Sequence, residues 1–500
     1  MFVRFEPNAA KVLRGRAAAP EGDRTTIKRG RISAKVVLMG ALLVGCLNYI
    51  QALDDRAPEK DGLFYYCVAA NIYEFRIYSS DCRSAATSGA DLEPTMRREP
   101  GLPALLSLTF AAASSPQDIR ACATLNSEGC GPLRTRQRII LLLPFLGLIL
   151  LTFLAAKDIT ENDLVAGAAA VCAAFGTGLV SNSVAFLTEP LAAFLILLVS
   201  WTLYRIVTKP ARIVVAVICG GALGLLALTK AVYFYFIPVL ALVALIATAI
   251  PSHRRAGISG MVAVVIAVMI SGVWIYRNHE VFGYYAISER AEKVMGIRAV
   301  LTTMTWSQYW TGYLAVTPVI GNRLIRLVGG DPGAAALFAR DPNPDIFFQR
   351  SRLSASDKER QAISVLVEHW PMQIALIPLT IYRSAFLPVG ITSYGAYKAS
   401  TAVRFLRLAS LAIAAVISLG MFPILFFNFF CALAKQDLAR LTFLMLSVYT
   451  VGIHSVATHY NPRFNLPLFG VLAIELCIAV SCMWGRFSRR VLVPSAEMMR

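Results

Sequence analysis

Charged side chains recur at the ends of the apolar segments of this sequence. Asp61 follows the first apolar segment, and Glu189 opens the fourth. Basic residues stand at comparable places, namely Arg98, Lys230, Arg277 and Arg463. A carboxylate can take the proton of an attacking hydroxyl group as a general base, and Lys and Arg can neutralise a phosphate. The combination predicts chemistry on an anion whose tail lies in a bilayer.

Each of these residues also has a purely structural interpretation. Arg277 and Arg463 fit interfacial anchors at the ends of spans, and Lys230 fits a polar turn residue. Glu189 fits a first-turn acid that the helix dipole favours. The functional interpretation therefore rests on the whole set, because acids and bases from five distant parts of the chain converge at one membrane face.

The composition excludes an ordinary soluble enzyme. The chain has 500 residues, of which 57% are hydrophobic and only 16% are charged, whereas soluble domains have about 25% charged residues. A chain this long and this poor in charge cannot cover its surface with polar groups. A disordered protein and a small disulfide-stapled scaffold are excluded as well. The net charge of +18 then reflects membrane orientation, and no nucleic-acid partner is predicted.

Uncharged segments of membrane-spanning length recur along the chain. A helix needs roughly 20 apolar residues to cross the bilayer core. The sequence therefore predicts an all-α integral membrane protein with about ten transmembrane helices. The predicted spans are 35–53, 138–156, 164–181, 186–204, 213–229, 231–250, 258–275, 406–432, 441–458 and 465–484. Only Lys230 separates the fifth from the sixth, which predicts a tight helical hairpin.

Basic residues indicate the orientation. Residues 1–35 carry nine Lys and Arg against three acids, and the alternate short loops are basic too. By the positive-inside rule both termini face the cytoplasm. The chain has no N-x-S/T sequon, which favours a bacterial inner membrane, with the charged ends of the spans facing the periplasm.

Two long segments lie outside in this topology, 54–137 and 276–405, here called the first and second outer segments. Segments of this length carry structure of their own. The apolar stretch 101–113 is too short to cross and predicts an interfacial helix. The stretch 371–389 contains a proline and an arginine, and it predicts an interfacial helix against the outer face. The remaining divisions are cytoplasmic tails at 1–34 and 485–500 and a transmembrane core at 35–275 and 406–484.

The cysteines give a further prediction. Four of the ten lie in the first outer segment, at Cys67, Cys82, Cys122 and Cys130. An even number on the oxidising side predicts up to two disulfides, with free thiols as the alternative. Zinc is the third interpretation, but the segment has no C-x2-C pair and no His. No metal site is predicted.

Six stretches resemble a known family in order and in sidedness. They are 61–79, with Asp61 before Tyr65 and Ala69-Ala70-Asn71; 97–103, Arg-Arg-Glu-Pro-Gly-Leu-Pro; 228–230, Leu-Thr-Lys; 274–283, with Trp274, Arg277, Asn278, Phe282 and Gly283; 369–371, His-Trp-Pro; and 463–467, Arg-Phe-Asn-Leu-Pro. Together they resemble the integral-membrane glycosyltransferases of the GT-C class. The likeness is to bacterial members related to protein O-mannosyltransferases and to the lipid A aminoarabinose transferase.

The resemblance implies a GT-C-like helical bundle and an inverting transfer of sugar from a polyprenyl-phosphate donor to an acceptor at the outer face. Asp61 is then the general base. Lys230, Arg277 and Arg463 are candidates for the donor phosphate or sugar, and Arg98 for shaping or charging the site. The acceptor is a glycan, a lipid or a protein. No cofactor is implied, although some GT-C relatives need a divalent ion.

Two departures from the family pattern affect the site. Many relatives have Asp-Glu where this chain has Asp61-Gly62, so a second acid must come from elsewhere, with Glu189 and Asp55 as candidates. The usual Arg-Tyr of the last loop is Arg463-Phe464 here, which removes a hydroxyl group.

Two other functions remain open. A polytopic lipid or polysaccharide transporter or flippase predicts internal repeats and ionisable residues near the middle of the spans. The chain shows no convincing repeat, and its spans are almost free of mid-membrane charge. A non-catalytic scaffold with the same fold is the third hypothesis.

Overall fold

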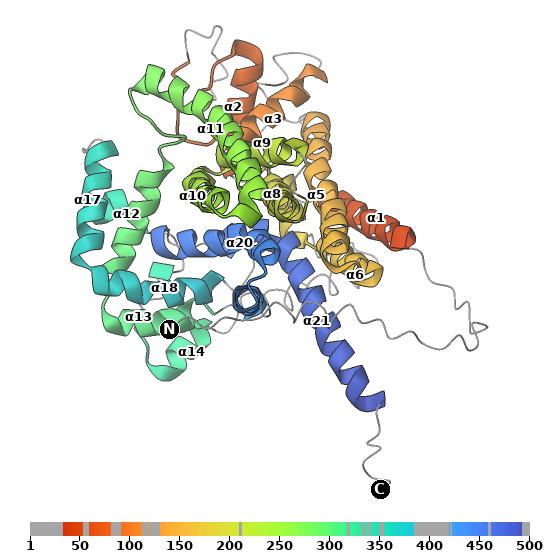
Figure 1. The fold of residues 1–500 in the computed structure, drawn as a ribbon. Coiled ribbons are helices and arrows are strands. Elements are labelled where there is room, and N and C mark those ends of the chain that lie inside the picture. The colour runs from red at the N-terminus through yellow and green to blue at the C-terminus, as the bar shows by residue number, and fades with distance from the viewer. Residues whose placement is uncertain are drawn as a thin grey trace, which may run out of the picture.

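The computed structural model of this chain is predominantly helical in the residues that it describes, and none of these residues forms a strand. These are 34–53, 60–81, 92–112, 119, 131–209, 213–317, 321–331, 333, 337–338, 342–349, 355–384, 420, 423–458 and 462–492. The helices of the bundle are α1 (Ala34–Leu53), α5 (Gly131–Thr160), α6 (Asp163–Ala174), α7 (Thr177–Val184), α8 (Glu189–Thr208), α9 (Ile213–Thr229), η5 (Ala231–Tyr235), α10 (Phe236–Ala249), η6 (Pro251–His253), α11 (Arg254–Phe282), α20 (Leu438–Ala457), η7 (Pro462–Leu468) and α21 (Phe469–Leu492). Figure 1 shows them packed side by side.

The predicted number of ten spans is not confirmed. Among the described residues six helices are long and apolar enough to cross a membrane, or up to eight if each of two bent helix pairs is one span. The predicted span 164–181 is one of these pairs, since α6 and α7 meet at an angle of 43°. The segments 213–229 and 34–50 are apolar helices below the length criterion. Most of 406–432 lies outside the described residues.

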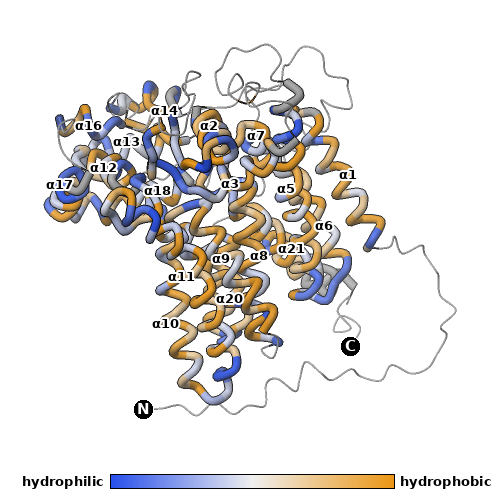
Figure 2. The backbone as a smooth tube through the Cα atoms, turned by 90° about the horizontal axis from the view of Figure 1, so that it is seen from above, coloured by the Kyte–Doolittle hydropathy of each residue, from blue (hydrophilic) through white to orange (hydrophobic). Residues whose placement is uncertain are grey.

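Small side chains allow the helices of the bundle to approach closely. The contact between α9 and α11 is lined by buried small residues, including Ala216, Gly220, Ala263 and Ala267. Helices associate in a bilayer through such close packing rather than through the hydrophobic effect. The outward faces keep large apolar side chains exposed, such as Leu245 on α10 and Met269 on α11, which suits contact with lipid. The apolar colouring of the bundle in Figure 2 agrees with this.

The outer segments form two smaller helical units at one end of the bundle (Figure 2). The first contains α2 (Lys60–Phe75), α3 (Gly101–Ser107) and η4 (Leu108–Ala112), around an apolar cluster that includes Tyr66 and Phe110. The second contains α12 (Arg290–Thr302), α13 (Trp306–Ala315), α14 (Gly321–Val328), α16 (Pro344–Phe347), α17 (Ala355–Glu368) and α18 (Trp370–Ser384). Its own cluster includes Leu301, Leu376 and Leu379.

Helix α18 lies across the end of α20. The side chain of Gln373 donates to the carbonyl of Val456 at 2.8 Å, and that of Thr380 donates to the carbonyl of Ser455 at 3.2 Å. Gln373 and Thr380 lie about 10 Å apart along α18, and they bond to adjacent carbonyls at the end of α20. A bend of 92° separates α17 from α18, so α18 does not continue α17 as one straight span.

A buried arginine completes this junction. Arg298 of α12 is fully buried, and its guanidinium donates to the side-chain oxygen of Gln373 at 2.7 Å, to the Gln373 carbonyl at 3.1 Å and to the Thr458 carbonyl at 3.2 Å. Burial lowers the pKa of Arg298 to about 9. The last carbonyls of a helix have no partner within it and carry partial negative charge. Arg298 and α18 together bond to three carbonyls at this end of α20, those of Ser455, Val456 and Thr458.

Candidate functional site

Asp61 lies in the first turn of α2, where the helix dipole favours an acid. Gly62 allows α2 to approach the turn between α7 and α8 very closely, because a Cβ atom at Gly62 would lie 2.0 Å from the carbonyl oxygen of Ala185. No other side chain fits there without displacing the backbone. The close approach brings Asp61 to the start of α8, where Glu189 lies.

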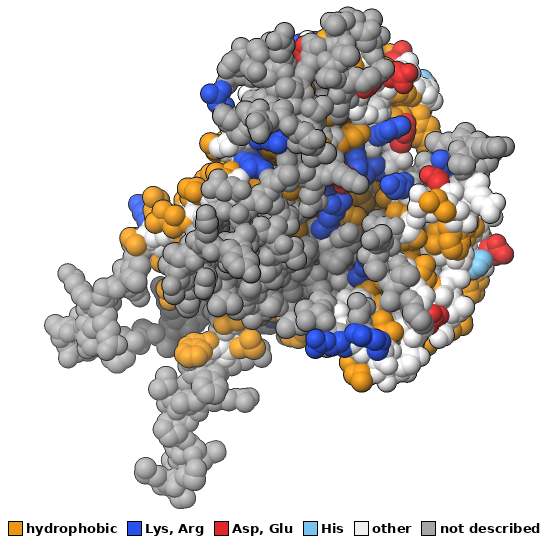
Figure 3. Space-filling model, turned by 180° about the vertical axis from the view of Figure 1, so that it is seen from behind, with side chains coloured by type: hydrophobic (Ala, Val, Ile, Leu, Met, Phe, Trp, Pro, Cys, Tyr) orange, Lys and Arg blue, Asp and Glu red, His pale blue; other side chains and the backbone are white. Residues whose placement is uncertain are grey.

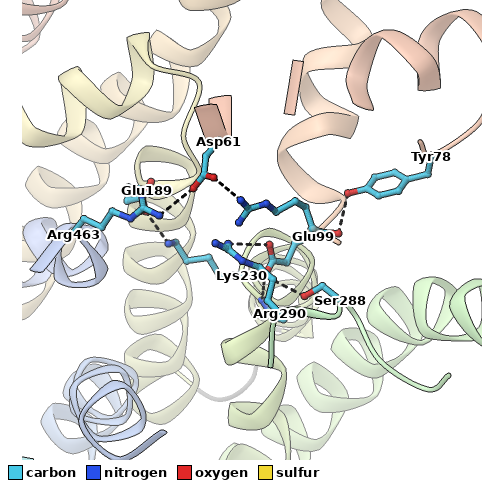
Figure 4. A network of polar contacts seen from close by, with 10 residues as sticks. Asp61, Tyr78, Glu99, Glu189, Lys230, Ser288, Arg290 and Arg463 are labelled. Carbon is cyan, nitrogen blue, oxygen red and sulfur yellow. Dashed lines mark hydrogen bonds and ion pairs between the residues drawn. The ribbon is translucent and has the colours of Figure 1, made fainter. Parts of the chain in front are cut away.

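Two arginines from distant segments hold the Asp61 carboxylate (Figure 4). The Nη2 atom of Arg98 lies 2.5 Å from Asp61 Oδ1, and the Nη2 atom of Arg463 in η7 lies 3.2 Å from Asp61 Oδ2. Arg98 also lies over the ring of Phe64. Because Asp61 and Arg463 are each 27% exposed and Arg98 18%, the group is half-buried and accessible from outside.

A second carboxylate lies beside the first. Glu189 is buried, and its Oε1 atom lies 3.0 Å from Nζ of Lys230 and 3.9 Å from Nε of Arg463. Lys230 forms the tip between α9 and η5, as the sequence predicted for a helical hairpin. Its ammonium group also lies 5.6 Å from the centre of the Phe464 ring. Arg463 therefore joins the two carboxylates into one network.

A third carboxylate, Glu99, belongs to the same site. It is buried, and its Oε1 atom accepts from the backbone N–H of Ala231 and from the Ser288 hydroxyl, both at 3.4 Å. Its Oε2 atom lies 3.7 Å from Nη1 of Arg290. Gly101 allows this arrangement, since a Cβ atom there would lie 2.6 Å from the Thr229 hydroxyl oxygen. Glu99 thus ties both outer segments to the hairpin tip (Figure 4).

The charges around Asp61 determine its protonation state. Burial raises the pKa of Asp61, but the positive charges of Arg98, Arg290 and Arg463 outweigh burial and hold the pKa below its ordinary value. Burial likewise lowers the pKa of Arg290, but the negative charges around it, with that of Glu99 the largest, together outweigh burial and raise the pKa. Both groups are therefore charged at neutral pH. Among the described residues the site holds four cations against three carboxylates, an excess of positive charge that suits an anionic ligand.

Five residues of this site were predicted from the sequence, and Asp61, Arg98, Glu189, Lys230 and Arg463 come together in the structure. The sequence placed Glu99 beside Arg98 at the same face but predicted no role for it. Arg290 lies in no motif. On the face shown in Figure 3, Lys and Arg side chains gather with a few acidic ones among them.

Arg277 is not part of this network. Its guanidinium lies 4.9 Å from the centre of the Trp274 ring and 5.7 Å from that of Tyr78, and it donates to the carbonyl of Thr95 at 3.2 Å. Asn278 beside it donates to the carbonyls of Ala286 and Ile287. The Arg277 contacts attach the end of α11 to the first outer segment, and those of Asn278 attach it to the start of the second.

The remaining predicted residues fall partly outside the described residues. Asp55, Cys82, Cys122 and Cys130 lie there, whereas Cys67 is disulfide-bonded. Within the described part of the chain, no group of three His, Cys, Asp or Glu side chains is arranged to hold a metal ion. Glu475 of α21 is a charged residue within a membrane-spanning helix, and no role was predicted for it from the sequence. It is fully buried and pairs with Arg440 at 2.6 Å and with Asn428 at 2.6 Å.

Comparison with known proteins gives structural similarities only. No protein-family model and no curated protein sequence matches the chain. The Archaeoglobus fulgidus oligosaccharyltransferase solved with Zn and sulfate is similar with a TM-score of 0.52 and 15% identity, over 91% of this chain and 50% of that one. The archaeal oligosaccharyltransferase AglB from Archaeoglobus fulgidus, in complex with an inhibitory peptide and a dolichol-phosphate, has a TM-score of 0.48 and 14% identity, over 92% and 52%. ArnT from Cupriavidus metallidurans, bound to undecaprenyl phosphate, has a TM-score of 0.37 and 16% identity, over 88% and 77%.

The first of these similarities covers nearly all of the chain. The chain spans about half the length of the oligosaccharyltransferases that it matches. At this level of identity the similarity shows a common fold. The chain has the GT-C-like, multi-span helical fold that the sequence predicted.

Proposed function

We propose that this protein is a membrane glycosyltransferase that moves a sugar from a polyprenyl-phosphate donor to an acceptor at the outer face of a bacterial inner membrane. The observation that carries the proposal is the convergence of Asp61 with Arg98, Lys230 and Arg463 at one end of the bundle. The similarity in fold to an oligosaccharyltransferase supports the same reaction class.

In the proposed reaction Asp61 is the general base. A hydroxyl group of the acceptor attacks the anomeric carbon of the sugar while its proton passes to the Asp61 carboxylate. The bond between that carbon and the phosphate oxygen breaks, with inversion, and the polyprenyl phosphate leaves with the bonding electron pair. Lys230 and Arg463 would stabilise the charge that develops on the leaving phosphate.

The ion pairs of Asp61 with Arg98 and Arg463 affect its strength as a base. Two arginines hold the carboxylate in its charged form, which makes Asp61 a weak proton acceptor. A donor phosphate that takes over part of the charge of Arg463 would raise the basicity of Asp61. The base would therefore become effective when the donor is bound.

Transfer of sugar from a radiolabelled polyprenyl-phosphate donor, measured with the full chain in nanodiscs, tests the proposal. Asp61→Asn should reduce the rate by about 100-fold or more, the range that general bases contribute. Glu93→Gln removes an exposed carboxylate of the same outer segment and should leave the rate unchanged. Full transfer by the Asp61 variant would exclude Asp61 as the base.

The transporter hypothesis has one observation in its favour, the pair of Glu475 with Arg440. An ionisable residue within a span is a common mark of a transport pathway. Glu475 is held at 2.6 Å by Arg440 and by Asn428. Lipid-linked sugar that crosses vesicles containing the protein, and ceases to cross with Glu475→Gln, would favour transport over transfer.

A further inference from the structure

The four cations of the site differ in how firmly a carboxylate holds them. Arg98, Lys230 and Arg463 each have a nitrogen within 3.2 Å of a carboxylate oxygen. Arg290 lies 3.7 Å from Glu99, in the one ion pair that the described part of the chain gives it. Its side chain is 35% exposed, against 14% for Lys230 and 18% for Arg98. Arg290 is therefore the least restrained and most accessible positive charge.

Glu99, the ion-pair partner of Arg290, also has weak hydrogen bonds. Glu99 has a side chain that is only 6% exposed, and both of its hydrogen bonds are long, at 3.4 Å. The Oε2 atom that faces Arg290 accepts no hydrogen bond within the described residues. A buried carboxylate requires close partners to offset its loss of hydration. The Glu99–Arg290 pair is thus poorly optimised compared with the pairs of Asp61 and Glu189.

Glu99 also determines where Arg290 can go. The residues before Arg290 are attached to the first outer segment, since Ser288 donates to Glu99 and the Glu289 N–H donates to the carbonyl of Met96 at 3.0 Å. The backbone next to Arg290 is therefore fixed, while its guanidinium is free to exchange partners. The charge of Arg290 lowers the pKa of Asp61 together with those of Arg98 and Arg463, so Arg290 adds to the positive potential around that carboxylate.

We propose that Arg290 is the residue that captures the phosphate group of the donor, by exchanging Glu99 for a phosphate oxygen. The inference rests on the proposed function and deepens it. Glu99 competes with the phosphate for Arg290 and lowers its affinity, while keeping the guanidinium in place when the site is empty. Arg290 then has the role of phosphate ligand that the sequence predicted for Arg277. The Arg277 side chain is already engaged by the Trp274 ring and the Thr95 carbonyl.

Binding of farnesyl phosphate to the full chain in nanodiscs, measured by titration calorimetry, tests the exchange. Arg290→Gln should weaken binding about tenfold or more, since it removes one charge-assisted contact. Arg323→Gln, which removes an exposed arginine of α14, should leave the affinity unchanged. Glu99→Gln should strengthen binding severalfold, because the competing negative charge is gone. A carboxylate that only maintained the fold would give the opposite sign.

The outcomes separate the inference from the proposed function. Weakening by Arg290→Gln with strengthening by Glu99→Gln supports the exchange. If Lys230→Gln weakens binding while Arg290→Gln does not, the role of Arg290 is overturned and the donor site stands. Weaker binding by Glu99→Gln also overturns the exchange. No binding of farnesyl phosphate by the unaltered protein would overturn both.

Discussion

Arg98→Gln should shift the acid limb of the transferase pH profile to higher pH. Arg98 makes the shortest contact with Asp61, at 2.5 Å, and its charge is the largest of the three that lower the pKa of that carboxyl. With Arg98 gone, burial and the two remaining arginines act alone. The pKa of Asp61 then rises, and the base becomes protonated at a higher pH.

The size of the shift follows from the geometry of the pair. Two unit charges about 4 Å apart interact by about 1 kcal/mol in water and about 4 kcal/mol at an effective dielectric constant near 20. Asp61 is 27% exposed and Arg98 18%, so screening by solvent places the pair between these limits. Since one pKa unit is about 1.4 kcal/mol, a shift of about one unit is expected.

The sign is fixed by the direction of the native pKa. A carboxyl with a lowered pKa is ionised at neutral pH and loses its charge only in acid. The unaltered enzyme should therefore keep its activity down to a pH below the ordinary Asp value of 3.8. The variant should lose activity at a pH about one unit higher, whatever else the substitution does to the maximal rate.

The assay is kcat/KM for sugar transfer between pH 3 and 8, with protein in nanodiscs. Arg97→Gln is the matched control, since it removes the same charge from an exposed position one residue away. Profiles of the Arg98 and Arg97 variants that superimpose would refute the reasoning. Asp61 would then not be the group whose protonation limits the reaction.

Three further predictions concern the frame of the site. Gly62→Ala should abolish transfer and lower Tm, because its Cβ would lie 2.0 Å from the Ala185 carbonyl oxygen and push Asp61 away. Arg298→Met should cost about 1–3 kcal/mol for each buried acceptor that it abandons, seen as a lower Tm in detergent, whereas Arg323→Met should not. Arg277→Gln should lower Tm without changing the KM for the donor, and a raised KM with unchanged Tm would place Arg277 in the donor site instead.

The helical bundle was predictable because a bilayer leaves a chain few alternatives. Backbone groups in lipid must bond within the segment, so an apolar stretch of sufficient length becomes a helix. The number of spans was less predictable, since hydropathy does not report a break. The predicted span 164–181 contains the break between α6 and α7, and α17 turns by 92° into α18. Such bends depend on packing against neighbours, which a window of sequence does not contain.

The site was predictable to the extent that its residues lie in motifs. Asp61, Lys230 and Arg463 each follow or precede a span, which places them at one end of the bundle. Arg290 was not predictable, because its position depends on the attachment of residues 288–289 to the first outer segment. Arg277 lies in a motif and at the end of α11, yet its side chain is engaged by aromatic rings. A sequence motif therefore indicates where the backbone of a residue lies, whereas packing determines the direction and the contacts of its side chain.

Gly62 explains why the three carboxylates of the site come from three different places in the chain. An Asp-Glu pair at this place would carry both acids in one helical turn, whereas the contact of Gly62 with Ala185 leaves no room for a side chain at position 62. The other carboxylates come from Glu99 and Glu189, each of which brings its own cation. In the proposed reaction an incoming phosphate would meet cations already oriented by carboxylates and would compete with each carboxylate. This competition would be weakest at the longest ion pair, that of Arg290 with Glu99, which is the basis of the proposed capture by Arg290.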